Sequence, residues 1–300
     1  MTLRIGTRRS RLATTQAGEV AARLNALGTA TELVPIETSG DRGASPDASP
    51  QGLKGLFVAE IVRALAAGDV DIAVHSAKDL PADETPGVVL GAVPQRARPF
   101  DVLVRRDAEL PDAAVVGTSS LRRRAQLHRA RPGVRVIELR GNVDTRLAKL
   151  EAGEVDAIVL AAAGIDRLGI SPRYSTTLHA DEMVPAPGQG AIAVQAREGD
   201  LETLQPIAAL EHPPTRVALV AERALMARMG GGCALPLGAL ATPHRNAVHL
   251  IAIVASPDGQ RIVRADVEGP GPAEAADAAA DHLLAGGAAD ILDAVHGATP

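Results

Sequence analysis

Short apolar runs of strand length alternate with longer amphipathic stretches over most of the chain, and this alternation constrains the fold more than any other feature. Runs at residues 3–6, 33–36 and 70–74 are predicted strands, and helical stretches lie between them. Strands that alternate with helices form parallel sheets covered by helices. The pattern continues to a predicted strand at residues 191–196, so this part of the chain is predicted to be α/β.

Two helical faces are clear in the first hundred residues. The first has apolar residues at spacings of three and four, namely Ala13, Ala17, Val20, Leu24 and Leu27. The second carries Phe57, Ile61 and Leu65 and ends at Gly68. Between them, residues 39–52 are rich in Gly, Pro, Ser and Asp, which predicts a mobile loop.

The last hundred residues follow a different pattern. A helix at residues 213–229 ends at three glycines. Residues 249–254 and 261–267 are predicted to form a hairpin, and two helices are predicted after it, at 272–284 and 288–296. This part is predicted to be a small α+β unit. The sequence shows no internal repeat.

Composition excludes several classes of partner. The net charge is −5, and the only aromatic residues are Phe57, Phe100 and Tyr174. The chain has no excess of basic residues and few aromatic side chains that could stack on bases. It is therefore not expected to bind nucleic acid. No apolar run has the length of a membrane span and no signal-like segment is visible, so we expect a cytoplasmic protein with no membrane partner, and a monomer.

Four polar clusters fall at predicted strand ends, where ligands of α/β sheets usually bind. They cover residues 7–10, 75–79, 117–124 and 139–146. They are rich in arginines, hydroxyl groups and helix N-termini, which suit a ligand with several negative charges, because arginine pairs with carboxylate or phosphate in a bidentate manner. The alternative for each cluster alone is a solvated surface.

The only cysteine, Cys233, follows Gly230, Gly231 and Gly232. A lone cysteine is usually a small buried apolar residue, and it excludes a disulfide within the chain. Three glycines let the backbone approach a bulky group, which favours a chemical role for the thiol. The chain has no P-loop, no dinucleotide-binding fingerprint and no metal-binding cluster in its sequence.

Taken together, these motifs resemble the porphobilinogen deaminase family. The stretch GGCALPLG at residues 231–238 resembles the family's cofactor-attachment loop, and HSAKDLP at 75–81 resembles its catalytic segment. Five further stretches match family signatures in the same order along the chain, at residues 54–57, 117–123, 139–147, 163–169 and 185–191. The resemblance covers nearly the whole chain.

The resemblance implies three domains, the first two similar to the lobes of periplasmic binding proteins. Domain 1 would span residues 1–94 and 191–208, domain 2 residues 95–190, and domain 3, a small α+β domain, residues 209–300. It further implies a dipyrromethane cofactor joined to Cys233 as a thioether. Porphobilinogen would be the substrate, and four molecules of it would be condensed, with loss of ammonia, into the linear tetrapyrrole hydroxymethylbilane.

The resemblance also implies roles for individual residues. Asp79 would be the catalytic carboxylate, Gln16 would contact water or substrate in the active site, and Phe57 would be a lid residue. Acetate and propionate groups of the cofactor and substrate would be bound by a larger set, namely Arg8, Ser10, Lys54, Ser76, Lys78, Thr118, Ser119, Ser120, Arg122, Arg123, Arg140, Gly141, Asn142, Arg146, Arg167, Gln189 and Gly190. The chain departs from the family pattern at Pro50, where a lysine is common, and at residues 96–101, where an acidic pair is usual.

Two other functions compete with this interpretation. A two-lobed anion-binding protein of the periplasmic type would explain the arginines, but it predicts a signal peptide and gives Cys233 no role. An enzyme acting on a sugar phosphate or nucleotide could use the Gly117-Thr118-Ser119-Ser120 turn to bind phosphate. That enzyme would be expected to carry a metal site or a P-loop.

Overall fold

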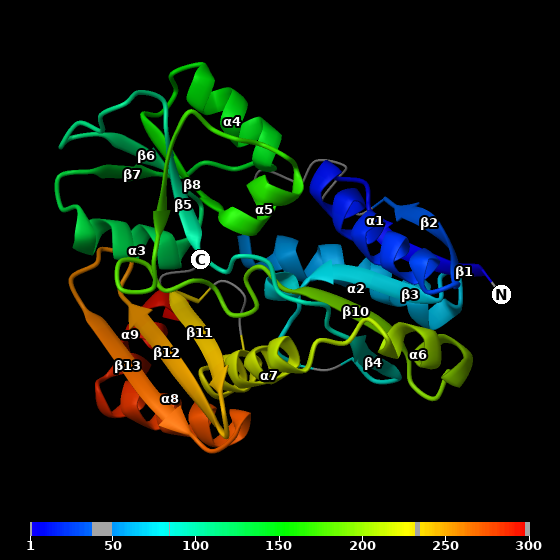
Figure 1. Cartoon of the computed structure of the whole chain (residues 1–300). Coiled ribbons are helices and arrows are strands. Elements are labelled where there is room, and N and C mark those ends of the chain that lie inside the picture. Colours follow the sequence, from blue (N-terminus) through cyan, green and yellow to red (C-terminus); the bar gives the residue numbers. More distant parts are fainter. Residues whose placement is uncertain (1, 38–49, 84, 232–234, 298–300) are drawn as a thin grey trace. The chain divides into compact units, whose positions relative to one another are not determined.

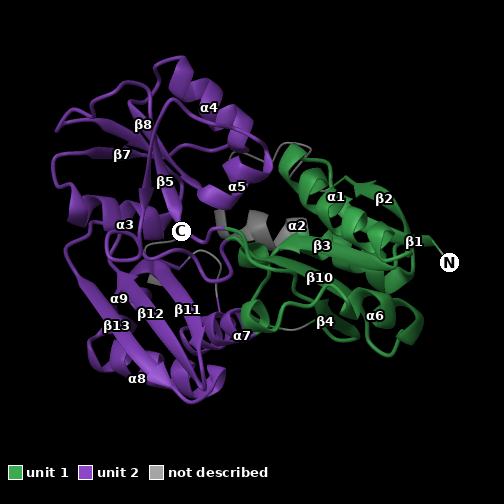
Figure 2. Cartoon of the chain, viewed as in Figure 1, with its two compact units in different colours: residues 1–97, 190–216 green, residues 98–189, 217–300 purple. Residues whose placement is uncertain are grey.

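The computed structural model describes residues 2–37, 50–83, 85–231 and 235–297, and for residues 50–57 and 296–297 it describes the backbone alone. The described chain divides into two compact units (Figure 2). Unit 1 consists of residues 1–97 and 190–216, and unit 2 of residues 98–189 and 217–300. Domains 2 and 3 of the sequence prediction fall largely in unit 2, although residues 95–97, 190 and 209–216 belong to unit 1, and their separate boundaries stay a prediction.

Unit 1 is built on a five-stranded sheet with the order β2-β1-β3-β10-β4 (Figure 1). Its strands are β1 (Thr2–Arg8), β2 (Ala30–Ile36), β3 (Ile72–Ser76), β4 (Val88–Ala92) and β10 (Ile192–Arg197). Strands β1, β2 and β3 are parallel, and β10 is antiparallel to both of its neighbours. Its helices are α1 (Arg11–Ala26), α2 (Pro50–Ala67), the short 3₁₀ helix η1 (Ala77–Asp79) and α6 (Leu201–Ala208).

Helices α1 and α2 cover opposite faces of this sheet. Leu3 and Ile5 of β1 pack with Ala17 and Val20 of α1 in one buried apolar cluster. On the other face, a Cβ built on Gly6 would lie 3.4 Å from the side chain of Ile61 in α2. The period-two alternation of a strand thus places successive β1 residues under different helices.

Unit 2 contains a second five-stranded sheet, with the order β7-β6-β8-β5-β9. Its strands are β5 (Asp101–Arg105), β6 (Val115–Gly117), β7 (Arg135–Ile137), β8 (Ala157–Ala161) and β9 (Tyr174–Leu178), and its helices are α3 (Leu121–Ala130), α4 (Val143–Glu151) and α5 (Ala162–Arg167). Strands β6, β7 and β8 are parallel, and β5 is antiparallel to both of its neighbours. The topology therefore repeats that of unit 1, a structural repeat for which the sequence gives no signal.

In each sheet, the strand at the fourth position is antiparallel to its neighbours, and its position in the sheet does not follow its position in the sequence. In unit 1 it is β10, which joins the sheet only after the chain has passed through residues 98–189. In unit 2 it is β5, the first strand after the chain leaves unit 1. Two chain crossings are thus built into the two sheets.

The third sheet is an antiparallel meander of β11 (Leu237–His244), β12 (Ala247–Ala255) and β13 (Ile262–Gly269). Helices α7 (Pro213–Arg228), α8 (Pro272–Ala285) and α9 (Ala288–Gly297) accompany it (Figure 1). Helix α8 packs closely on β13 because the residues at the contact are small. A Cβ built on Gly269 of β13 would collide with the backbone nitrogen of Ala275 in α8, at 2.4 Å. The boundary between the units falls within α7, after Arg216.

The mixed α/β fold predicted from the sequence is confirmed, with errors at single elements. Helix α2 begins at Pro50, so the prediction that residues 50–52 belong to a loop is wrong, while the rest of that loop, 39–49, lies outside the described residues. Leu27 lies past the end of α1 and is 57% exposed rather than buried. The sequence prediction also missed β9, β11 and α6, whose apolar periodicity is short or interrupted.

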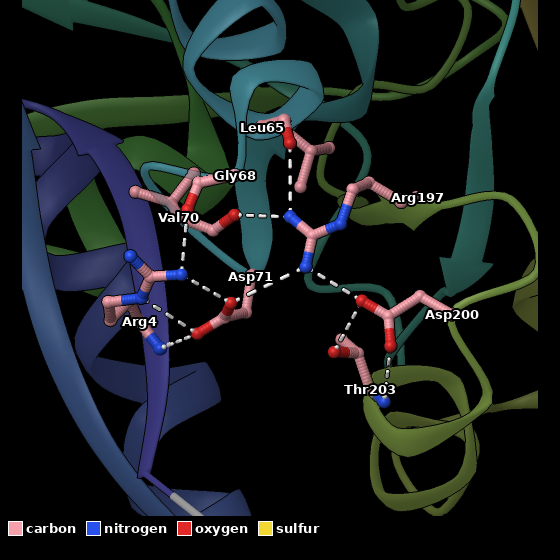
Figure 3. Close-up of polar contacts among 8 residues, drawn as sticks. All are labelled: Arg4, Leu65, Gly68, Val70, Asp71, Arg197, Asp200 and Thr203. Atoms are coloured by element: carbon pink, nitrogen blue, oxygen red, sulfur yellow. Dashed lines mark hydrogen bonds and ion pairs between the residues drawn. The ribbon is translucent and has the colours of Figure 1, made fainter.

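A partly buried polar network around Asp71 joins the strands of unit 1 at the edge where β1 and β3 begin (Figure 3). Asp71 accepts hydrogen bonds from the backbone N–H of Arg4 at 2.8 Å and from its guanidinium at 2.8 and 3.1 Å. Arg197 of β10 contacts the same carboxylate at 3.5 Å and also binds Asp200, the N-cap of α6. Burial raises the pKa of Asp71, but the bonds from Arg4 and Arg197 more than offset it, so the pKa is lowered overall.

His75 of β3 is buried and is the first residue of the predicted catalytic segment. It lies beside the neighbouring strand β10, and its Nε2 atom is buried without a hydrogen-bond partner. Burial lowers its pKa to about 4, against smaller opposing effects from the charge of Asp79 and from Gln195. His75 is therefore neutral at physiological pH.

The turn between β12 and β13 packs closely on α3, and this contact can be tested. Gly259 has a φ of +71°, and a Cβ there would lie 2.7 Å from the carbonyl oxygen of Ala125. Gly169 has a φ of +64° with nothing within 4 Å of a Cβ, so it is the matched control. We expect Gly169→Ala to cost roughly 1–2 kcal/mol of unfolding free energy, from backbone strain alone. Gly259→Ala should cost about 1–3 kcal/mol more, from the overlap.

Urea unfolding of the two variants measures this difference. Equal losses for Gly259→Ala and Gly169→Ala would mean that the turn does not approach α3 as closely as the structure has it.

The neutral state of His75 predicts a pH dependence of stability. Its folded pKa lies below the ordinary value of 6.5, so the unfolded chain binds the proton more tightly, and stability falls as pH falls from 6.5 towards 4. We expect His75 to contribute about 2 kcal/mol of the stability lost between pH 7 and pH 5. His75→Gln should lose that much less over this interval.

The exposed His244 provides the control, since His244→Gln should leave the pH 7 to pH 5 difference unchanged. Urea unfolding at the two pH values measures it. If His75→Gln and the unaltered protein lost the same stability, His75 would be protonated in the folded state.

Candidate functional site

The predicted polar clusters lie at the same kind of place in both units, the edge of the sheet where parallel strands end. In unit 1, Arg8 is the last residue of β1, and Ser76 is the last residue of β3. In unit 2, Gly117 is the last residue of β6, residues 118–120 follow it, and residues 138–142 follow β7. The carboxyl ends of parallel strands meet at one edge, so the sheets gather each set of side chains.

Three of the predicted binding residues are helix caps. The side chains of Ser10, Ser120 and Asn142 accept hydrogen bonds from backbone N–H groups in the first turns of α1, α3 and α4. Each cap fixes a helix N-terminus at the edge where a strand ends, and the positive end of the helix dipole favours an anion there.

In unit 1 the structure brings Gln16 and Ser76 together. Gln16 of α1 donates a hydrogen bond from Nε2 to the Ser76 hydroxyl at 2.9 Å. The next three residues form η1, which presents Lys78 and Asp79 as half-buried side chains. Arg8, Gln16, Ser76, Lys78 and Asp79 therefore all lie where β1 and β3 end.

In unit 2 the two arginines at the start of α3 are almost completely buried. The side chains of Arg122 and Arg123 are 4% and 7% exposed, and both form ion pairs with Asp101, at 2.8 and 2.7 Å. Burial raises the pKa of Asp101, yet the charges of Arg122 and Arg123 hold it far below its usual range. Burial, together with the charge of Arg123, lowers the pKa of Arg122.

Arg146 of α4 differs from these two arginines. Burial, and then the charge of Arg123, lowers its pKa to about 10. Its Nε atom is buried without a hydrogen-bond partner, and among the described residues no carboxylate pairs with it. Arg140, by contrast, is half exposed and pairs with Glu138 at 2.7 Å.

The remaining candidates of unit 2 surround the same edge. Thr118 is buried and accepts the backbone N–H of Ser120, and the Ser119 hydroxyl donates to the carbonyl of Leu139 at 2.6 Å. Gly141 has a φ of +124°, and a Cβ there would lie 2.7 Å from Thr145. Arg167 ends α5 and is half-buried.

The candidates Gln189 and Gly190 fall on either side of a unit boundary. Gln189 belongs to unit 2, where it is fully buried and donates to Asp101 and to the carbonyl of Pro99. Gly190 belongs to unit 1, and its carbonyl accepts from the backbone N–H of Ala97. Cys233 and the side chains of Lys54 and Phe57 lie outside the described residues.

Sequence reasoning assigned no role to Asp101, which the structure places among the candidate arginines. The sequence feature that could have identified it is an acidic residue at the start of an otherwise apolar strand, Asp101-Val102-Leu103-Val104.

Metal sites and membrane-spanning helices were also sought in the described residues. Over the described ranges no group of three metal-ligating side chains comes together, and no helix within them is long and apolar enough to span a membrane.

Each unit presents its own set of polar groups at its sheet edge. Unit 1 offers the half-buried carboxylate of Asp79 and the capped N-terminus of α1. Unit 2 offers several guanidinium groups and the capped N-termini of α3 and α4. Guanidinium groups and helix N-termini bind carboxylates or phosphates. A half-buried carboxylate can donate or accept a proton.

Two family models match most of the chain. Residues 3–205 match the family model described as porphobilinogen deaminase, dipyromethane cofactor binding domain, and residues 217–285 match the model of the porphobilinogen deaminase C-terminal domain. Among solved structures, a periplasmic substrate-binding protein of an ABC transporter from Coxiella burnetii is 18% identical, with a TM-score of 0.43. That match covers 71% of this chain and 94% of the other.

Full-length relatives carry the same name as the family models. The porphobilinogen deaminase of Roseiflexus castenholzii is 47% identical, with 97% of this chain and 98% of the relative covered. Those of Syntrophotalea carbinolica and Brevibacillus brevis are 46% and 43% identical, and each match covers at least 96% of both chains. The chain belongs to the porphobilinogen deaminase family, whose members are transferases with a dipyrromethane cofactor-binding domain.

Proposed function

We propose that the chain condenses four porphobilinogen molecules into hydroxymethylbilane, with release of ammonia, on a dipyrromethane cofactor attached to Cys233. The observation that carries this proposal is the excess of guanidinium groups at the edge of the unit 2 sheet, where Arg146 has no carboxylate partner among the described residues. The family match favours this function over a two-lobed anion-binding protein without catalysis.

The residues present fit such a cofactor. Every pyrrole ring of dipyrromethane and of porphobilinogen carries an acetate and a propionate, so the ligand is a polyanion. Arg146, with its buried and unpartnered Nε, would bind one of these carboxylates, and the capped N-terminus of α3 would favour another. Thr118, Ser119, Arg140 and Arg167 lie along the same edge and would add hydrogen bonds. When bound, the cofactor supplies the pyrrole carbon to which the first substrate is joined.

Asp79 would be the group that handles protons. The aminomethyl group of porphobilinogen must leave as ammonia, which breaks a C–N bond and leaves a positive charge on the substrate. A carboxyl group at Asp79 would protonate the leaving nitrogen, stabilise that positive charge as a carboxylate, and then take the proton lost from the pyrrole carbon when the new C–C bond forms. Each addition thus returns Asp79 to its starting state.

The surroundings of Asp79 suit this role. It lies on η1 directly after β3 and is half-buried, so a substrate can reach it while part of its surroundings excludes water. A positively charged His75 would compete with the substrate cation for the Asp79 carboxylate. His75 stays neutral because burial lowers its pKa. Lys78 and Arg8 lie at the same edge and would pair with substrate carboxylates.

The covalent attachment can be tested by mass. We expect the purified protein to be heavier than its sequence by two pyrrole units, and to keep this mass after denaturation, because a thioether survives unfolding. Peptide mapping should place the added mass on Cys233. Cys233→Ser should lack it, since the hydroxyl is a much weaker nucleophile than a thiolate. An active protein with an unmodified Cys233 that reacts with alkylating agents would contradict the proposal.

The role of Asp79 can be tested by Asp79→Asn, which keeps the size of the side chain but removes its charge and acidity. We expect turnover to fall by at least about three orders of magnitude, within the range of general acid-base effects, with little change in thermal stability. The nearby exposed Asp83 is the control, and Asp83→Asn should keep normal turnover. Ammonia release and tetrapyrrole absorbance measure both. More than a tenth of normal turnover in Asp79→Asn would rule out Asp79 as the catalytic group.

A further inference from the structure

The segment by which the chain enters unit 2 contains an arginine to which the family resemblance assigns no role. Arg98 is the first residue of unit 2, and it lies within residues 96–101, where the chain departs from the family pattern. Its guanidinium binds the carboxylate of Asp166 through Nη2 at 2.6 Å and through Nε at 2.8 Å. Its Nη1 also lies 3.5 Å from the hydroxyl of Thr177 in β9. Such a bidentate pair fixes the orientation of the two side chains as well as their distance.

Asp166 belongs to α5, the short helix that follows β8 at the edge of the sheet where the ligand would bind. Ala161 ends β8, and α5 begins at the next residue, Ala162. Asp166 lies in the last turn of α5, directly before Arg167, which is one of the predicted ligand-binding residues. The ion pair therefore joins the entry segment to the helix that carries Arg167.

The entry segment contacts α5 near both of its ends. At the start of the helix, the backbone N–H of Ala162 donates to the carbonyl of Phe100 at 2.9 Å. In the last turn, the carboxylate of Asp166 binds Arg98. The two contacts are about one helical turn apart, so together they restrict both the tilt and the rotation of α5 against the entry segment.

The composition of α5 makes its orientation depend on such contacts. A helix of six residues is too short to be stable in isolation, so contacts with the rest of the unit determine its position. Three of its four buried residues are alanine or glycine, and small side chains make few packing contacts. The backbone N–H of Gly169 closes the last turn by donating to the carbonyl of Asp166 at 3.0 Å. The pair with Arg98 thus acts on how the helix is oriented and not on where it ends.

We propose that Arg98 is a positioning residue: its bidentate pair with Asp166 sets the orientation of the last turn of α5 and so directs Arg167 towards a carboxylate of the ligand. The inference rests on the proposed function and deepens it. The side chains of Arg98 and Asp166 are 50% and 39% exposed, so their pair contributes little to global stability. Its effect is expected in the binding of porphobilinogen, through Arg167.

Reversal of the pair in the full-length protein tests this role, with the apparent KM for porphobilinogen as the readout. We expect Arg98→Asp to raise KM about three- to fivefold, because two carboxylates then repel each other. Asp166→Arg should raise KM by a similar factor, because two guanidinium groups then repel each other. The double variant brings opposite charges together again and should return KM to within about twofold of normal. Since Asp79 is untouched, kcat should stay within about twofold of normal in all three variants.

The variant Asp166→Arg separates the orientation of α5 from a general effect of charge. It adds positive charge near a site for carboxylates, so the electrostatic field alone would lower KM, whereas loss of the pair raises it. A lowered KM in Asp166→Arg would therefore overturn the proposal. Failure of the double variant to restore KM would also overturn it, because Arg98 would then bind the ligand itself.

The dependence on Arg167 is tested by repeating Arg98→Asp in the Arg167→Gln background. If Arg98 acts through Arg167, the additional rise of KM in this background should be less than about 1.5-fold. An equal rise of KM in both backgrounds would mean that the two arginines act independently, and would overturn the proposal.

Arg106 provides the matched control, because it also pairs with an aspartate in unit 2. It binds Asp156 at 3.0 Å at the opposite edge of the same sheet, and its side chain is 38% exposed. Arg106→Asp changes the net charge by the same amount as Arg98→Asp and should change KM less than about 1.5-fold. An equal rise of KM in Arg106→Asp would show that any reversal of charge on unit 2 produces the effect, and would overturn the proposal.

Melting temperatures distinguish the proposed role from a loss of folding. Because the pair is exposed, Arg98→Asp should melt within about 3 °C of the unaltered protein. A larger loss that the double variant does not reverse would make Arg98 a structural residue and overturn the proposal. If the unaltered protein consumes no porphobilinogen, the proposed function fails and this inference fails with it. Normal consumption together with an unchanged KM in Arg98→Asp overturns the inference alone.

Discussion

The carboxylate of Asp101, buried between two guanidinium groups, is the interaction on which the rest of unit 2 depends. An unpaired charge at this depth would be strongly destabilising, so Asp101, Arg122 and Arg123 can be buried only together. Their joint burial fixes the start of α3, and through Val184 and Gln189 it fixes the two segments by which the chain enters and leaves the unit. The same cluster keeps one surplus positive charge, which a site for carboxylates requires.

The repeated sheet topology explains how the functional groups are distributed. Both five-stranded sheets place the ends of three parallel strands at one edge, and both complete the sheet with an antiparallel strand from a chain crossing. In unit 1 that edge holds Asp79, while the Asp71 network lies at the opposite edge. In unit 2 it holds Arg146 and the N-terminus of α3.

Much of this could be predicted from the sequence, because local patterns carry it. Alternating apolar runs predict the α/β class, and Ser120 before a helix predicts its cap. Whether an arginine forms an ion pair inside the protein depends on residues that are distant in the chain. Arg122 pairs with Asp101 of β5, whereas the buried Nε of Arg146 has no hydrogen-bond partner, and no local sequence pattern distinguishes the two arginines. The structural repeat was invisible for a similar reason: strand order is set by pairing between distant segments. Cys233 was found from its glycine neighbours and the family motif, and its role stays a prediction.

The most direct test of the whole account is the mass of the intact protein after a brief exposure to limiting porphobilinogen. The account predicts a ladder of species above the starting mass, each heavier than the last by one porphobilinogen minus ammonia and ending at four additions, with hydroxymethylbilane released as the heaviest disappears. In Asp79→Asn the ladder should not advance. Formation of tetrapyrrole while the mass of the protein stays constant would contradict synthesis on a tethered cofactor, and so would a protein that binds porphobilinogen without releasing ammonia.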